Sequence, residues 1–74
     1  MRLSEFTRAV DAEFGARGDA VVTDLALTAL EYRTAAEALD AGVPARDVWL
    51  ALCAEADVPP ERRYGVGRLE ARRR

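Results

Sequence analysis

The sequence predicts an all-α fold, a small single-domain bundle of about four helices with a helix-turn-helix-like corner between the third and fourth. Three observations predict it. Apolar residues recur at helical spacing in several segments. Capping residues and glycines separate these segments. The larger apolar side chains in the 74 residues are enough for one core and not for two.

The first helix is expected from about Ser4 to Phe14. Ser4 is a favourable N-cap, and Glu5 lies in the first turn, where the helix dipole favours a negative charge. Gly15 is expected to end the helix. A narrow apolar stripe is predicted to face the core and consists of Leu3, Phe6, Val10 and Phe14.

The second helix is expected from about Ala20 to Tyr32, with Asp19 as its N-cap. Its broad apolar face predicts that it is the central helix, and this face consists of Val21, Val22, Leu25, Ala26, Ala29 and Leu30. Leu27 lies off that face, between Asp24 and Glu31.

The third helix opens on a capping box, Thr34 to Glu37, and is expected to close at Gly42. The fourth is expected from about Pro44 to Ala56, before Val58-Pro59-Pro60 stops it. Its predicted buried face is Val48, Trp49, Leu52, Cys53 and Ala56, whereas Leu50 points elsewhere. We therefore expect a helical domain over residues 1–60 and a disordered, Arg-rich tail over residues 61–74.

Composition limits the function. No histidine and only one cysteine are present, so the chain offers neither a usual zinc site nor a Cys-His pair. We expect no enzyme activity, no metal and no cofactor. Cys53 is expected to be an inert, buried thiol. Without an apolar leader or membrane span, a cytoplasmic location is expected.

The corner carries the spacing of a DNA-binding motif, in Ala38, Gly42, Val43, Val48 and Leu52. Only Arg46 could read a base there, and the neighbouring Asp47 would repel phosphate. Residues 1–60 hold five arginines and eleven carboxylates, a net charge of −6. The corner is therefore expected to be structural.

The tail reverses this charge, since residues 61–74 hold six arginines and two glutamates, a net charge of +4. These arginines could hold nucleic-acid phosphates or an acidic partner, and with Arg46 they are the candidate nucleic-acid contacts: Arg62, Arg63, Arg68, Arg72, Arg73 and Arg74. A solvated tail without a partner is the alternative.

A protein contact is the other hypothesis. Leu27 and Leu50 both lie off the main stripes, and together with Trp49 they would form an apolar patch if the fold brought them to one side. Isolated exposed leucines are common, and that is the alternative interpretation.

Several stretches resemble a known family. They are the start MRLSEF, the Phe14-Gly15 pair and especially RTAAEALDAGVPARDVWLALCAEADVPPERR. Over residues 1–63 the chain is similar to the actinobacterial family called domain of unknown function 3046. The resemblance implies a small, all-helical cytoplasmic protein without assigned catalytic residues, and a loose link to DNA recombination and repair.

The function expected from the sequence is thus a non-catalytic module that binds another protein, through a patch of Leu27, Trp49 and Leu50. Nucleic-acid association through the tail and the corner is the alternative. The two hypotheses differ in salt dependence, because phosphate contacts weaken steeply as salt rises and apolar contacts do not.

Overall fold

Short helices joined by tight turns make up residues 1–63, the part of the chain that this computed structural model describes. In chain order the elements are α1 (Leu3–Phe14), a 3₁₀ turn (Gly15–Arg17), α2 (Gly18–Asp24), a second 3₁₀ turn (Thr28–Leu30), α3 (Ala35–Asp40), α4 (Ala45–Glu55) and α5 (Pro60–Arg63). The predicted all-α fold class is confirmed.

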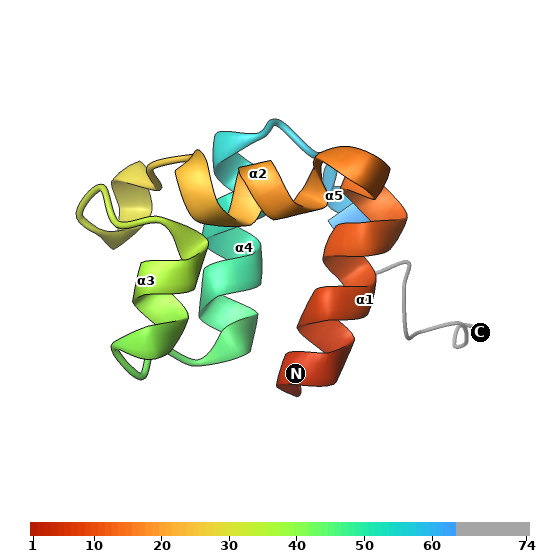
Figure 1. Cartoon of the computed structure of the whole chain (residues 1–74). Coiled ribbons are helices and arrows are strands. Elements are labelled where there is room, and N and C mark those ends of the chain that lie inside the picture. Colours follow the sequence, from red (N-terminus) through yellow and green to blue (C-terminus); the bar gives the residue numbers. More distant parts are fainter. Residues whose placement is uncertain (64–74) are drawn as a thin grey trace.

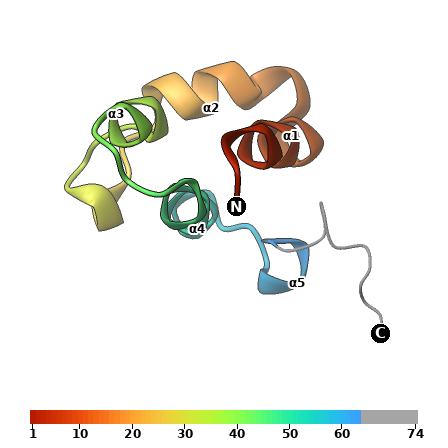
Figure 2. The same cartoon turned by 90° about the horizontal axis from the view of Figure 1, so that it is seen from below.

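The helices form two layers (Figures 1 and 2). α1, α3 and α4 run side by side and are all seen nearly end-on in Figure 2, while α2 lies across α1 and α3. The short α5 lies on the opposite side of the molecule from α2, next to α4.

The core is built around α4, not around the second helix as expected. Five residues of α4 are buried, whereas Gly18 is the one buried residue of α2. The predicted apolar face of the second helix is only half-buried or, at Ala26 and Ala29, exposed. The buried hydrophobic residues of the described chain are Phe6, Ala9, Val10, Leu27, Ala35, Ala38, Val48, Trp49, Ala51, Leu52, Cys53 and Val58.

The expected extent of the second helix is wrong. α2 ends at Asp24, and Leu25 adopts an extended conformation with φ −80° and ψ 117°. Leu27 then forms an isolated antiparallel bridge with Arg33, whose carbonyl accepts a hydrogen bond from the Leu27 amide at 2.9 Å. Because the chain leaves the helix here, the Leu27 side chain enters the core and is 0% exposed.

A tight turn at Glu31 and Tyr32 reverses the chain after this segment. Both residues have positive φ, 59° and 66°, and the Arg33 amide donates to the Leu30 carbonyl at 3.1 Å. This combination is the pattern of a type I′ turn, which usually carries Asn-Gly. Two side-chain-bearing residues at positive φ therefore cost folding free energy.

Replacing Tyr32 tests this cost. Its side chain is 72% exposed, so Tyr32→Gly loses little packing and removes the left-handed penalty. We expect the free energy of unfolding to rise by about 0.5–1 kcal/mol, measured by urea denaturation followed by circular dichroism. Tyr32→Ala removes the same ring but keeps a Cβ, and it should not be stabilised. Equal stabilities of the two variants would contradict the argument.

The start and end of α3 agree with the prediction. The Glu37 amide donates to Thr34 Oγ1 at 3.1 Å, and the Thr34 amide donates to Glu37 Oε1 at 2.9 Å, which completes the capping box. Gly42 follows with φ 95°, and the Val43 amide donates to the Ala38 carbonyl at 3.0 Å. This is a Schellman motif, and it brings the chain directly into α4.

α4 also ends in a Schellman motif, but its left-handed residue is not a glycine. Asp57 has φ 59°, and the Val58 amide donates to the Cys53 carbonyl at 2.9 Å. In both motifs the valine after the left-handed residue faces the apolar core, which is the contact that commonly accompanies this cap.

The first helices begin earlier than expected. α1 starts at Leu3, not at Ser4, and Glu5 Oε1 accepts a hydrogen bond from the Arg2 amide at 2.6 Å, which lowers the pKa of the Glu5 carboxyl. Leu3 is 60% exposed and so lies outside the core to which it was assigned. α2 starts at Gly18, which places Asp19 in the first turn, not at the cap.

The domain also extends further than expected. Proline is favoured at the first position of a helix, and α5 begins at Pro60 and includes Glu61 to Arg63, which were assigned to the tail. The predicted disorder of residues 64–74 falls on residues outside the described part of the chain.

Candidate interaction surface

The apolar patch predicted from Leu27, Trp49 and Leu50 is not present on the surface. Leu27 is 0% exposed and Trp49 is 2% exposed. Leu50 is half-buried and packs against the core. Since the second helix stops at Asp24, Leu27 is not held on the outer side of a helix as the pattern suggested.

Trp49 is enclosed by contacts from both ends of the described chain. Its ring meets Phe6 of α1 edge to face, with centroids 6.3 Å apart. Its Nε1–H donates to the Arg63 carbonyl at 2.7 Å. The aromatic ring is therefore a structural core group whose polar atom is satisfied by the last described residue.

The described arginines among the candidate nucleic-acid contacts differ in availability. Arg62 pairs with Glu13 of α1 at 2.7 Å, and Arg63 Nε donates to the Val58 carbonyl at 2.9 Å. Arg46 is exposed at the start of α4, next to the exposed Asp47. The other candidates, Arg68, Arg72, Arg73 and Arg74, lie outside the described residues.

A groove between α1, α2 and α3 is the candidate interaction surface. Its volume is about 630 Å³. The residues that line it come from most of α1, the first 3₁₀ turn, α2 and α3: Leu3, Ser4, Phe6, Thr7, Arg8, Val10, Asp11, Gly15, Ala16, Gly18, Asp19, Val22, Thr23, Ala36 and Leu39.

Gly18 sets how closely α1 and α2 approach at one end of the groove. It is the buried residue of α2, and a Cβ placed there would lie 3.0 Å from Val10 Cγ1. A side chain at residue 18 would press against Val10. The missing side chain thus allows α2 to cross directly over α1.

The floor of the groove is apolar and its edge is charged. Phe6 and Val10 are buried, while Val22 and Leu39 are partly exposed. The exposed Leu3 stands at the edge and so adds apolar area that water still reaches. The charged residues lining the groove are Arg8, Asp11 and Asp19.

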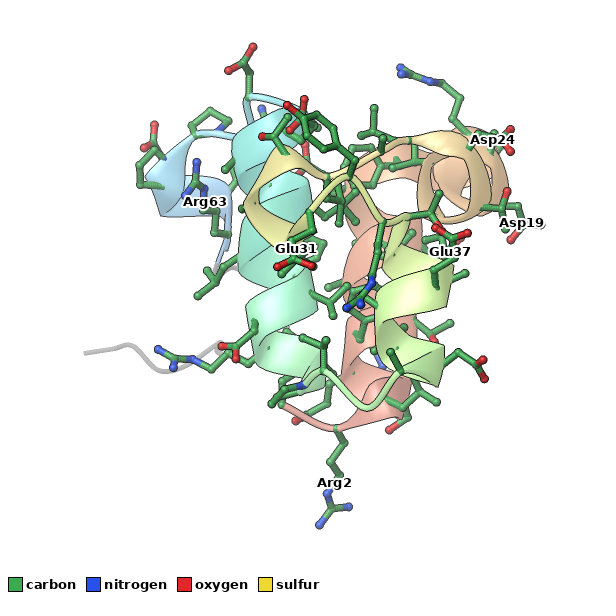
Figure 3. The ribbon with its side chains drawn as sticks, turned by 90° about the vertical axis from the view of Figure 1, so that its left-hand side faces the viewer. Arg2, Asp19, Asp24, Glu31, Glu37 and Arg63 are labelled. Atoms are coloured by element: carbon green, nitrogen blue, oxygen red, sulfur yellow. The ribbon has the colours of Figure 1, made fainter. Side chains whose placement is uncertain are left out.

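The side-chain view places three labelled carboxylates of α2 and α3 on one side of the molecule (Figure 3). Asp19 and Asp24 of α2 and Glu37 of α3 point outward together, whereas Arg63 lies on the opposite side. The net charge of residues 1–60 is −6. The groove therefore combines an apolar floor with an edge that carries two aspartates, Asp11 and Asp19, and one arginine, Arg8.

A second hollow lies between the end of α1, α2 and the end of α4. It is lined by groups of both signs, including Glu13, Arg17, Asp24, Glu55 and Arg62. Two of them, Glu13 and Arg62, pair with each other. The Glu55 carboxylate accepts hydrogen bonds from the amide and hydroxyl of Thr28. Of these five residues, Glu13, Glu55 and Arg62 thus make contacts within the fold.

Comparison with known families gives a match over residues 1–61 to a family described as "Protein of unknown function (DUF3046)". The chain belongs to this family. The match confirms the resemblance seen in the sequence, and it covers α1 to α4 and the start of α5. No match was found among curated proteins or among solved structures. The groove of this DUF3046 protein is therefore interpreted from its own residues.

Over residues 1–63 no helix is long and apolar enough to cross a membrane. In the same range no three side chains of His, Cys, Asp or Glu come together so that they could hold a metal ion.

Cys53 is the free thiol of α4 and is completely buried. Burial raises the pKa of the Cys53 thiol to about 11, from an ordinary value of 9.0, although the positive charge of Arg63 opposes the shift. A thiol with this pKa stays protonated at neutral pH and is a poor nucleophile. The expectation of a buried thiol is confirmed.

The raised pKa predicts how stability depends on pH. Only the unfolded thiol ionises between pH 9 and pH 11, so the stabilisation is present below pH 9 and is lost as pH rises to about 11. We expect the urea midpoint of the wild type to fall more steeply over this range than that of Cys53→Ala. Parallel curves would show that the thiol does not titrate differently on folding.

The groove of this DUF3046 protein was not predicted from the sequence. Leu3 and Val22 were assigned to the core, but a helix as short as α2 cannot cover all of α1. The break after Asp24 determines this length, and no Gly, Pro or Asn marks it. If the second helix had been predicted to end at Asp24, part of α1 would have been expected to lie uncovered.

Proposed function

We propose that this DUF3046 protein is a non-catalytic module that binds another protein in the groove between α1, α2 and α3. The observation that supports the proposal is the apolar area of the groove, which stays open to water at Val22 and Leu39 of the floor and at Leu3 of the edge. Burying such area against a partner is favourable by about 25 cal/mol per Å². A groove between helices is also a common receptor for a protein segment.

The groove replaces the patch expected from the sequence, while the class of function stays the same. Trp49 and Leu27 could contact a partner only if the core opened, because both are buried. In the groove, Leu3, Val22 and Leu39 are exposed or partly exposed and need no such opening, whereas Phe6 and Val10 are themselves buried. The proposed contact surface is therefore α1, α2 and α3, and α4 acts as the scaffold behind them.

Position-specific photo-crosslinking in the native host tests this proposal. A benzophenone amino acid replaces Thr7, an exposed residue that lines the groove, or Ala54, an exposed residue of α4 outside it. We expect a discrete, heavier protein adduct from residue 7 and none from residue 54. Equal adduct patterns, or no adduct from residue 7, would count against the groove as a protein contact.

Nucleic-acid association is the second candidate, and the net charge of +4 over residues 61–74 favours it. It predicts weak binding of duplex or single-stranded DNA that falls steeply as salt rises. Fluorescence anisotropy of the full chain beside a chain ending at Arg63 tests it, because this truncation keeps the hydrogen bond to Trp49. Unchanged binding without residues 64–74 would exclude this role for the tail.

A further inference from the structure

We infer that the occupant of the groove is an amphipathic helix of a partner protein that carries arginine or lysine beside its apolar face. This inference rests on the proposed function and adds the shape and the charge of the partner. It follows from the form of the groove, from its lack of buried polar groups and from the charge around it.

The form of the groove favours a helix over a strand. The lining follows α1 from Leu3 to Asp11 and continues into Gly15 and Ala16. At 1.5 Å per residue, the 12 residues of α1 are about 18 Å long, which matches about three turns of a partner helix. Apart from the isolated Leu27–Arg33 bridge, residues 1–63 form no strand to which a partner strand could be added.

The chemistry of the floor favours an apolar helix face over a small polar ligand. Pockets for small molecules normally contain a few polar groups that fix the orientation of the ligand. Within residues 1–63 no polar or charged residue is buried. The floor formed by Phe6, Val10, Val22 and Leu39 can therefore recognise apolar shape alone.

The charged residues around the groove favour one sign of charge on the partner helix. Asp11 and Asp19 line the groove, and Glu37 of α3 points outward on the same side as Asp19 (Figure 3). Arg8 is the opposing charge in the lining. A helix with basic residues at the edge of its apolar face would meet attraction on the α2 and α3 side, and an acidic one would meet repulsion.

Two designed peptides test the inference with the full chain. Both have the same leucine and alanine face over about four turns, and the flanking positions carry either arginine or glutamate. We expect the arginine peptide to bind and to shift the NMR amide signals of Thr7, Val22 and Leu39. The glutamate peptide should bind at least about threefold more weakly.

Charge reversals on the protein localise the effect. Asp19→Arg changes the groove edge, and Asp47→Arg makes the same change in net charge on α4, outside the groove. We expect Asp19→Arg to weaken binding of the arginine peptide about threefold or more, and Asp47→Arg to leave it nearly unchanged. Equal weakening by both variants would mean diffuse attraction to an acidic protein and would overturn the inference.

Other results have defined meanings. Equal affinity for both peptides would contradict the inference that the partner helix carries basic residues. The groove would then remain a binding site for an apolar helix face. Concentration-dependent shifts of the groove amides without peptide would identify a second copy of the chain as the occupant and would overturn the inference. If crosslinking at residue 7 succeeds but the peptides are not distinguished, the charge argument fails and the proposed function stands.

Discussion

Replacing Leu27 by alanine should remove most of the stability of the domain. The side chain is 0% exposed, and truncating a buried leucine to alanine costs about 2–5 kcal/mol. A domain of this size has a total stability of only about 3–9 kcal/mol. We therefore expect a large fall in the urea midpoint, or loss of the helical circular dichroism signal, for Leu27→Ala.

Leu3→Ala is the matched control for this prediction. It makes the same chemical change at a leucine that is 60% exposed, so its midpoint should stay close to that of the wild type. The helical interpretation of residues 25–30 would place Leu27 on the surface and predicts no difference between the variants. Near-wild-type stability of Leu27→Ala would therefore show that the chain does not leave the helix at Leu25.

Trp49→Ala should be similarly severe. The ring of this α4 residue contacts Phe6 and belongs to the buried core cluster, and truncation of a buried large aromatic residue costs about 3–5 kcal/mol. It also leaves the carbonyl of Arg63 without its donor. We expect Trp49→Ala to be largely unfolded at 37 °C by circular dichroism.

Trp49→Phe separates the two contributions. Phenylalanine keeps an aromatic ring next to Phe6 but has no donor for the Arg63 carbonyl. We expect a loss of about 1–2 kcal/mol from the unpaired carbonyl and the smaller ring. A variant as unstable as Trp49→Ala would mean that the hydrogen bond to Arg63, not packing, dominates.

The features that sequence predicted well are those set by local interactions. The capping box of Thr34 and Glu37 needs only residues within one turn, and the end at Gly42 needs only one residue able to adopt positive φ. Similarly, Val48, Trp49, Leu52 and Cys53 are buried on α4 as their spacing predicts, whereas the predicted Ala56 is only half-buried at the C-cap and the buried Ala51 was not predicted.

The second helix was predicted too long because its continuation is decided by distant contacts. The periodicity of Val21, Val22, Leu25 and Leu30 fits a helix as well as it fits the observed structure. The break is instead fixed by the burial of Leu27 and by Glu55, which accepts two hydrogen bonds from Thr28. The turn at Glu31 and Tyr32 lacks the Asn-Gly signal that would have marked it.

The groove could not be predicted for a related reason. It depends on how α1, α2 and α3 lie relative to one another, and residues far apart in sequence form its two sides. The acidic character of the body was evident from composition. Which of its carboxylates line the groove, Asp11 and Asp19, became visible only in the folded chain.

The bond between Trp49 and Arg63 also bears on how the chain folds while it is being made. Synthesis proceeds from the N-terminus, and the indole donor in α4 has no acceptor until residue 63 has been added. The ion pair of Glu13 likewise cannot form until Arg62 has been added. A nascent chain that ends before this point lacks both contacts, and the indole N–H and the Glu13 carboxylate then bond to water instead.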